Sequence, residues 1–232
     1  MRIGLYHHIG SEESIDAIID QFARALDADE FDLLVGPEYL FTNDGGLFEK
    51  AAKDGLVERL AELTLGKKAV LIPGTIVWGN PWEDFTIYAN SAPLLYDGNV
   101  VGEVTKHSVR PADKTFANAS MASYLIPEFH SEYLPSYFSE RSFTIAGKRY
   151  LVEICDDHPF AINVMRTPLL SDIDVHVVVS NENNHHFTQP PDKLLLKEGG
   201  LFVECNGQHP SSYVGLLKGN TLVDLYVSAL ES

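Results

Sequence analysis

Three side chains that could act together in catalysis lie in different thirds of the chain, each at the end of an apolar run. They are Glu38, Lys106 and Cys155. A thiol with a carboxylate and an ammonium group beside it is a nucleophile with a base and an electrostatic stabiliser. If the fold brings the three together, they are the minimum set for acyl transfer through a covalent thioester.

Each of these residues also has an ordinary structural interpretation. A lone cysteine is more often a small buried hydrophobe than a nucleophile, and a lone lysine is usually exposed. Glu38 alone could be a solvated charge at the end of a strand. The structural interpretation needs three independent coincidences, so we favour the catalytic one. Cys205 has no such partners in the sequence, and we expect it to be a core residue.

Other kinds of chemistry find little support in the sequence. The chain has nine histidines, including the pairs His7-His8 and His185-His186, but no HExxH or comparable ligand spacing. We therefore expect no metal and no cofactor. The two cysteines follow no disulfide or metal pattern, so we expect reduced thiols in a cytoplasmic protein.

The composition limits the kinds of molecule that the protein is expected to bind. The formal net charge is -16, whereas nucleic acids require a basic surface. No apolar run approaches the roughly 20 residues of a membrane span. The first residues lead directly into the predicted strand that contains Ile3–Tyr6, and they lack the pattern of a secretory signal peptide. We expect a small-molecule partner, with neither nucleic acid nor membrane.

The hydrophobic pattern predicts strands alternating with helices. The predicted strands are Arg2–His8, Phe31–Val35, Ala69–Trp78, Ile87–Tyr96, Val100–Thr105, Phe143–Ile145, Tyr150–Ile154, Val175–Ser180, Leu201–Cys205, Ser212–Leu217 and Leu222–Val227. The predicted helices are one capped by Ser11 and running to Leu26, one from Phe48 to Leu63, Pro159–Leu170, and Asp192–Glu198. The stretch Val109–Ser142 is irregular. A single α/β domain over residues 1–232 with mixed strand pairing fits best.

Three motifs in this order resemble the nitrilase superfamily, the thiol-dependent carbon–nitrogen hydrolases. The segment Asp32–Glu38 is similar to that family's strand ending in Pro-Glu. The hairpin Leu94–His107 resembles the one that carries its lysine, and Ile154–Asp157 resembles its cysteine turn. The resemblance extends over essentially the whole chain.

The resemblance implies a four-layer α-β-β-α sandwich and cleavage of a small amide. Glu38 would be the general base, Lys106 the oxyanion stabiliser and Cys155 the nucleophile. A second glutamate upstream of the cysteine is typical of the family, and Glu132, before Tyr137-Phe138, fits it best. The resemblance also implies a homo-oligomer such as a homodimer. Glu128 and Glu140 are the alternatives to Glu132.

The residues after Cys155 suggest the substrate. This chain has Glu153-Ile154-Cys155-Asp156-Asp157, and a similar string, Glu-Ile-Cys-Glu-Asp, is typical of the glutaminase domains of the superfamily. In those domains the acidic residue after the cysteine holds the amino group of glutamine. This similarity implies substrate binding by Asp156. His158 stands where the family often has an arginine, and we assign it to substrate binding as well. The missing arginine and the short C-terminal segment are departures from the family pattern.

Two other classes of function stay open at this level. One is a catalytically impaired binding or regulatory protein on the same fold, which the departures favour. The other is a metal-dependent phosphoesterase on a similar sandwich, which would use histidine and aspartate ligands.

Overall fold

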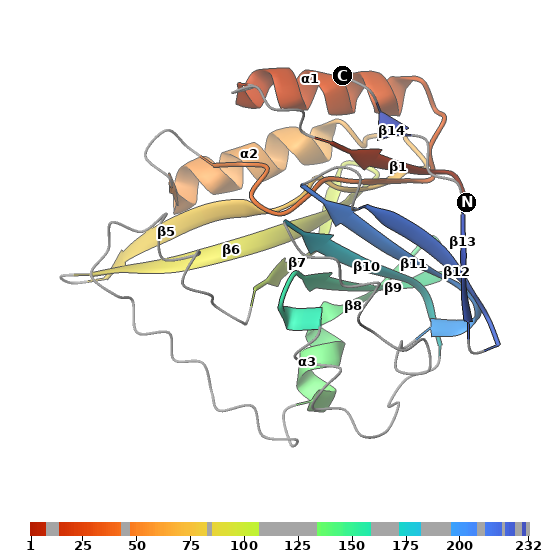
Figure 1. The fold of residues 1–232 in the computed structure, drawn as a ribbon. Coiled ribbons are helices and arrows are strands. Elements are labelled where there is room, and N and C mark those ends of the chain that lie inside the picture. The colour runs from red at the N-terminus through yellow and green to blue at the C-terminus, as the bar shows by residue number, and fades with distance from the viewer. Residues whose placement is uncertain are drawn as a thin grey trace.

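The computed structural model describes residues 1–7, 14–42, 47–82, 85–106, 134–158, 172–181, 196–207, 212–219, 221–225 and 229–230. These residues form two β-sheets that pack face to face, with helices on the outer sides (Figure 1). Among them, no helix is long and apolar enough to span a bilayer.

The first sheet comes mainly from the N-terminal half of the chain. Its strands are β1 (Ile3–Tyr6), β2 (Leu33–Val35), β3 (Phe48–Glu49), β4 (Val70–Ile72), β5 (Ile76–Trp82), β6 (Phe85–Tyr96), β7 (Asn99–Thr105) and β14 (Ala229–Leu230). Their order is β14-β1-β2-β4-β6-β5-β3, and β7 pairs with β6. The strands β14, β1, β2 and β4 run parallel, whereas β4, β5 and β7 each pair antiparallel with β6.

The second sheet comes from the C-terminal half. Its strands are β8 (Ser142–Ile145), β9 (Lys148–Ile154), β10 (Ile173–Ser180), β11 (Leu196–Asn206), β12 (Tyr213–Lys218) and β13 (Thr221–Asp224). They follow the order β13-β12-β11-β10-β9-β8, with β9, β10 and β11 parallel.

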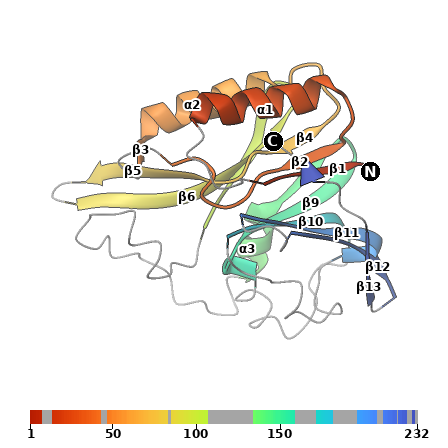
Figure 2. The ribbon, with the colours of Figure 1, turned by 45° about the horizontal axis from the view of Figure 1, so that its top comes forward.

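Four layers result from this arrangement (Figures 1 and 2). Helices α1 (Ile15–Asp27) and α2 (Lys50–Glu62) cover the first sheet, and their apolar faces form one core with it. The inner faces of the two sheets form a second core, which includes Val152, Val177 and Val203. Helix α3 (Leu134–Arg141) lies on the outer face of the second sheet, where Phe138 packs with Phe202. The α/β prediction and the α-β-β-α layering are confirmed.

Several details differ from the sequence prediction. The side chain of Ser14, rather than Ser11, caps α1 by accepting a hydrogen bond from the amide of Ala17. Residues 196–198 belong to β11 instead of a helix. Leu196 pairs with Ile173 of β10, and the register shifts before Leu201 pairs with Val175. The stretch predicted as irregular ends in α3. The helix predicted over Pro159–Leu170 lies outside the described residues.

The two parallel sets of strands bring distant segments to the same edge of the sandwich. Glu38 follows β2 of the first sheet, and Cys155 follows β9 of the second. A hydrogen bond of 3.2 Å from the amide of Glu38 to the carbonyl of Ser180 joins the two sheets at this edge. Side chains from the carboxyl ends of β2, β9 and β10 therefore meet.

Two backbone hydrogen bonds, with the end of β4 and with the segment that follows it, fix the segment that carries Glu38. The amide of Gly36 donates to the carbonyl of Ile72 at 2.8 Å, and that of Thr75 donates to the carbonyl of Pro37 at 3.2 Å. A Cβ at Gly36 would overlap the backbone carbonyl of Pro73. Because backbone cannot move aside as a side chain can, only glycine permits this approach.

We predict that Gly36→Ala lowers the free energy of unfolding by about 1–3 kcal/mol, as overpacking against rigid backbone does. Gly55→Ala is the matched control, since Gly55 lies within α2 and a Cβ there meets nothing within 4 Å. That change should raise the free energy of unfolding by up to about 1 kcal/mol through helix propensity. Urea denaturation of both variants measures the difference, and equal effects would contradict the assigned role of Gly36.

Candidate active site

The fold brings Glu38, Lys106 and Cys155 together. The Nζ atom of Lys106 lies 2.7 Å from Oε1 of Glu38, and both side chains are almost fully buried. The Cys155 side chain is hydrogen-bonded to the same carboxylate. A carboxylate thus lies between a thiol and an ammonium group, in an environment that excludes most water.

The environment of Glu38 tunes its proton affinity. Burial raises the pKa of this carboxyl, and the charge and hydrogen bond of Lys106 offset the rise only in part. The hydrogen bond from Cys155 also lowers the pKa, whereas the charge of Asp156 raises it. A carboxylate whose pKa is raised is a better acceptor for a thiol proton near neutral pH.

Lys106 is held by Asn90, a residue of β6. The amide of Lys106 donates to the carbonyl of Asn90 at 2.8 Å, and Nδ2 of Asn90 donates to Oε1 of Glu38 at 3.0 Å. Tyr39 adds its hydroxyl, 3.4 Å from Nζ of Lys106. Asn90 was not predicted from the sequence, because its polarity within the strand Ile87–Tyr96 does not by itself indicate a contact with Glu38.

Cys155 lies at a sharp turn that ends β9. Its φ angle is 48°, in the left-handed region, where a non-glycine residue carries roughly 1–3 kcal/mol of strain. Its amide donates to the carbonyl of Val179 at 2.8 Å, and its carbonyl accepts from the amide of His158 at 3.1 Å. A strained turn at the end of a strand is the geometry that projects a nucleophile out of a sheet.

The other predicted site residues differ in placement. Asp156 is buried and its charge acts on Glu38. His158 is fully buried, and its Nδ1 lies 2.6 Å from Oε2 of Glu153. Glu132 and Glu128 lie outside the described residues, and Glu140 is an exposed residue of α3.

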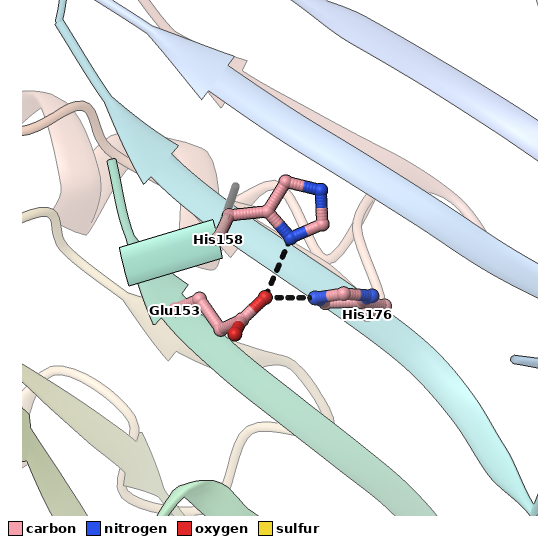
Figure 3. A group of neighbouring side chains, drawn as sticks. All are labelled: Glu153, His158 and His176. Atoms are coloured by element: carbon pink, nitrogen blue, oxygen red, sulfur yellow. Dashed lines mark hydrogen bonds and ion pairs between the residues drawn. The ribbon is translucent and has the colours of Figure 1, made fainter. Parts of the chain in front are cut away.

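A second polar cluster lies behind the turn, on the outer face of the second sheet (Figure 3). Nε2 of His176 lies 2.7 Å from the same Oε2 of Glu153 that His158 contacts. The hydroxyl of Tyr137 donates to Oε1 of Glu153 at 2.9 Å. His176 and Tyr137 were not identified from the sequence, because each reads as an ordinary member of an apolar segment.

The charges of this cluster are strongly perturbed. Burial alone would raise the pKa of Glu153, but the charges and hydrogen bonds of His158 and His176 hold it well below its usual range. Burial lowers the pKa of His176, and Glu153 offsets this only in part. Burial, with the charge of Glu153, raises the pKa of Tyr137.

Arg141 of α3 joins the turn to the segment that carries Lys106. One of its nitrogens donates to the carbonyl of Thr105 at 2.9 Å and lies 3.5 Å from Oδ2 of Asp157. Its guanidinium stacks 3.9 Å from the ring centre of Tyr137. This buried arginine joins the segments that carry Lys106 and Cys155, and no sequence pattern predicted its role.

Among the described residues, one group of side chains has ligand atoms close enough to hold a metal ion, within 4.8 Å of one another. It consists of Glu153, His158 and His176.

Cys205 is fully buried, and its thiol lies 3.3 Å from the carbonyl of Val35. Burial raises the pKa of this thiol far above its usual range, so Cys205 is a core residue as expected.

Comparison with known proteins gave matches at the level of structure. No protein-family model matches the chain, and no curated protein matches it. Among solved structures, Nit3 of Saccharomyces cerevisiae, a member of branch 10 of the nitrilase superfamily, is 16% identical with a TM-score of 0.58. The match covers 96% of this chain and 84% of Nit3.

Two larger enzymes contain a similar unit. The glutamine-dependent NAD+ synthetase of Acinetobacter baumannii is 19% identical with a TM-score of 0.54, over 94% of this chain and 41% of the synthetase. That of Cytophaga hutchinsonii is 14% identical with a TM-score of 0.54, over 97% of this chain and 40% of the synthetase. The chain therefore has the nitrilase-superfamily fold, as the sequence motifs predicted, and spans less than half of either synthetase.

We predict that the protein loses stability on mild acidification because of His176. Its pKa is lowered in the folded state, so as pH falls below about 6.5 the unfolded chain binds the proton first, which favours unfolding. The lowered pKa of Glu153 adds a further loss only below about 4.5. Stability should therefore be full above about pH 6.5 and decline below it.

The variant His176→Gln tests this origin, since glutamine can still donate to Glu153 but does not titrate. Its free energy of unfolding should change less between about pH 7 and 5 than that of the wild type. Urea titrations across that range measure both slopes. Identical slopes would assign the acid sensitivity to other groups.

Proposed function

We propose that the chain is a thiol-dependent carbon–nitrogen hydrolase that cleaves a small amide through a thioester on Cys155. The observation that carries the proposal is the Glu38 carboxylate, hydrogen-bonded to the Cys155 thiol and paired with Lys106 at 2.7 Å. The nitrilase-superfamily fold supports it, because the three residues have the order and strand contexts of that family's motifs. A reduced thiol of this kind suits a cytoplasmic compartment.

In the first half-reaction Glu38 takes the proton of the thiol, and the sulfur attacks the amide carbon. The electron pair of the C=O bond moves to oxygen, where Lys106 stabilises the negative charge together with the backbone N–H of Asp156. The C–N bond then breaks, and the protonated Glu38 gives its proton to the leaving ammonia or amine. The product on the enzyme is a thioester.

In the second half-reaction a water molecule attacks the thioester, and Glu38 accepts a water proton. The C–S bond breaks, the carboxylic acid leaves, and the sulfur recovers its proton. We assign Glu132 as the second glutamate, which orients Lys106 and the water. Turnover of Glu132→Gln, set beside Glu128→Gln and Glu140→Gln, measures which carboxylate has this role.

For the substrate we propose a small amide whose acyl part carries an ammonium group, as glutamine does. Asp156 is buried next to Glu38, so the acidic side of the site disfavours an anionic acyl group. Both structurally similar synthetases are named as glutamine-dependent. His158 is fully buried against Glu153, so we propose that it contributes to substrate binding by supporting the turn that carries Asp156. We also propose a homodimer, which sedimentation of the purified chain would measure.

We predict that Cys155→Ala lowers amide hydrolysis by at least roughly a thousandfold, as loss of other nucleophiles does. Cys205→Ala is the matched control and should keep most of the activity. Intact-mass measurement should find an acyl adduct on the wild type and on the Cys205 variant alone. Activity should also survive exhaustive chelation, and inactivation by Cys205→Ala or by EDTA would overturn the proposal.

We predict that Asp156→Asn discriminates between substrates. Losing a charge-assisted hydrogen bond should lower kcat/KM for a glutamine-like amide by roughly ten- to a hundredfold. A simple aliphatic amide, which offers no ammonium group, should be affected far less. Equal losses on both substrates would show that Asp156 acts on the turn instead of the ligand.

A further inference from the structure

We propose that Glu153 is a positioning residue, which holds Cys155 in the strained turn that directs the thiol toward Glu38. It does so through hydrogen bonds from Tyr137, His158 and His176. The inference rests on the proposed function, because that function gives the thiol its role.

The hydrogen bonds of Glu153 span the turn from one side to the other. Figure 3 shows the contact between Glu153 and His158, whose two atoms lie 2.6 Å apart. Glu153 precedes Cys155 by two residues and His158 follows it by three, so this contact closes a ring of the chain that includes Cys155. The amide of His158 also donates to the carbonyl of Cys155 at 3.1 Å. The peptide on both sides of the thiol is therefore fixed to one carboxylate.

Two further contacts fix that carboxylate to elements outside the turn. His176 belongs to β10, whose backbone pairs with β9 up to Ile154. Tyr137 belongs to α3, and its hydroxyl also lies 3.4 Å from the carbonyl of Asp157. The position of the turn is thus set by the sheet and by the helix above it.

The strain energy of the turn and the free energy that a hydrogen bond to Glu153 contributes are similar in size. The left-handed φ of Cys155 costs roughly 1–3 kcal/mol, so it persists only where the surroundings impose it. A hydrogen bond to a charged group contributes about 1.5–3 kcal/mol. Removing the charge of Glu153 weakens its bonds to both histidines, which is enough to let the turn relax.

The distances favour hydrogen bonds over a metal centre. Two ligands of one tetrahedral zinc ion at about 2.1 Å stand roughly 3.3 Å apart. The nitrogens of His158 and His176 lie 2.6 and 2.7 Å from Oε2 of Glu153, which are hydrogen-bond distances. The oxygen that would bind the ion is already shared by the two rings.

The sign of the electrostatic effect gives a decisive test. A carboxylate near a thiol disfavours the thiolate, so by charge alone Glu153→Gln would raise the thiolate fraction of Cys155 near neutral pH and leave the plateau rate constant at high pH nearly unchanged. Positioning predicts a lower plateau, because a relaxed turn moves the sulfur away from Glu38 and Lys106. The change in the plateau rate constant therefore separates the two effects.

The experiment is alkylation of Cys155 by iodoacetamide, followed by intact mass across pH 5 to 9 in the purified full chain. For Glu153→Gln we expect the plateau rate constant at high pH to fall about tenfold or more. The matched control is Glu204→Gln, which changes a fully buried carboxylate on β11, the strand on the far side of β10 from Glu153. Its glutamine keeps an oxygen for the hydroxyl of Ser180, which lies 3.2 Å from Oε1 of Glu204.

The results that test this inference differ from those that test the proposed function. If the Glu204 variant keeps the wild-type plateau while its thermal stability falls as much as that of the Glu153 variant, the loss belongs to positioning. An unchanged or faster plateau for Glu153→Gln would overturn the inference, as would a stoichiometric metal ion in the wild type that this variant lacks. Slow alkylation of wild-type Cys155 would instead count against the proposed function.

Discussion

The buried ion pair between Glu38 and Lys106 is the constraint on which the arrangement of the candidate site depends. Removing both charges from water costs several kcal/mol for each ion, and only good geometry with further hydrogen bonds offsets that cost. Asn90 supplies such a bond to Glu38 and also fixes the backbone of Lys106. The pair therefore requires β6 and the segment after β2 in one relative position.

Backbone contacts between the two sheets at this edge add a second constraint. The amide of Glu38 reaches across to the carbonyl of Ser180 at the end of β10, and the amide of Cys155 bonds to Val179 one residue earlier. Glu38 and Cys155 are thus tied to neighbouring positions of a single strand. The apolar core between the sheets holds them together, but these polar contacts set which side chains meet.

Much of the fold and the central site could be predicted from the sequence, because both depend on local patterns. Apolar runs ending at Glu38 and Cys155 marked strand ends, and the carboxyl ends of parallel strands meet at one edge. Asn90 and His176 escaped prediction because each side chain gets its role from a contact across strands, which no local pattern encodes. His158 was assigned to substrate by analogy with an arginine, whereas its ring is fully buried against Glu153.

Arg141 of α3 links the turn after Cys155 to the segment that carries Lys106. Arg141 reaches both Asp157, two residues after the thiol, and the carbonyl of Thr105, next to Lys106. Tyr137, one helical turn earlier, lies under its guanidinium and bonds to Glu153. A single face of one short helix thus braces the turn and the lysine segment together. Since those two segments come from different sheets, this helix can keep the thiol and the ammonium group at a fixed separation.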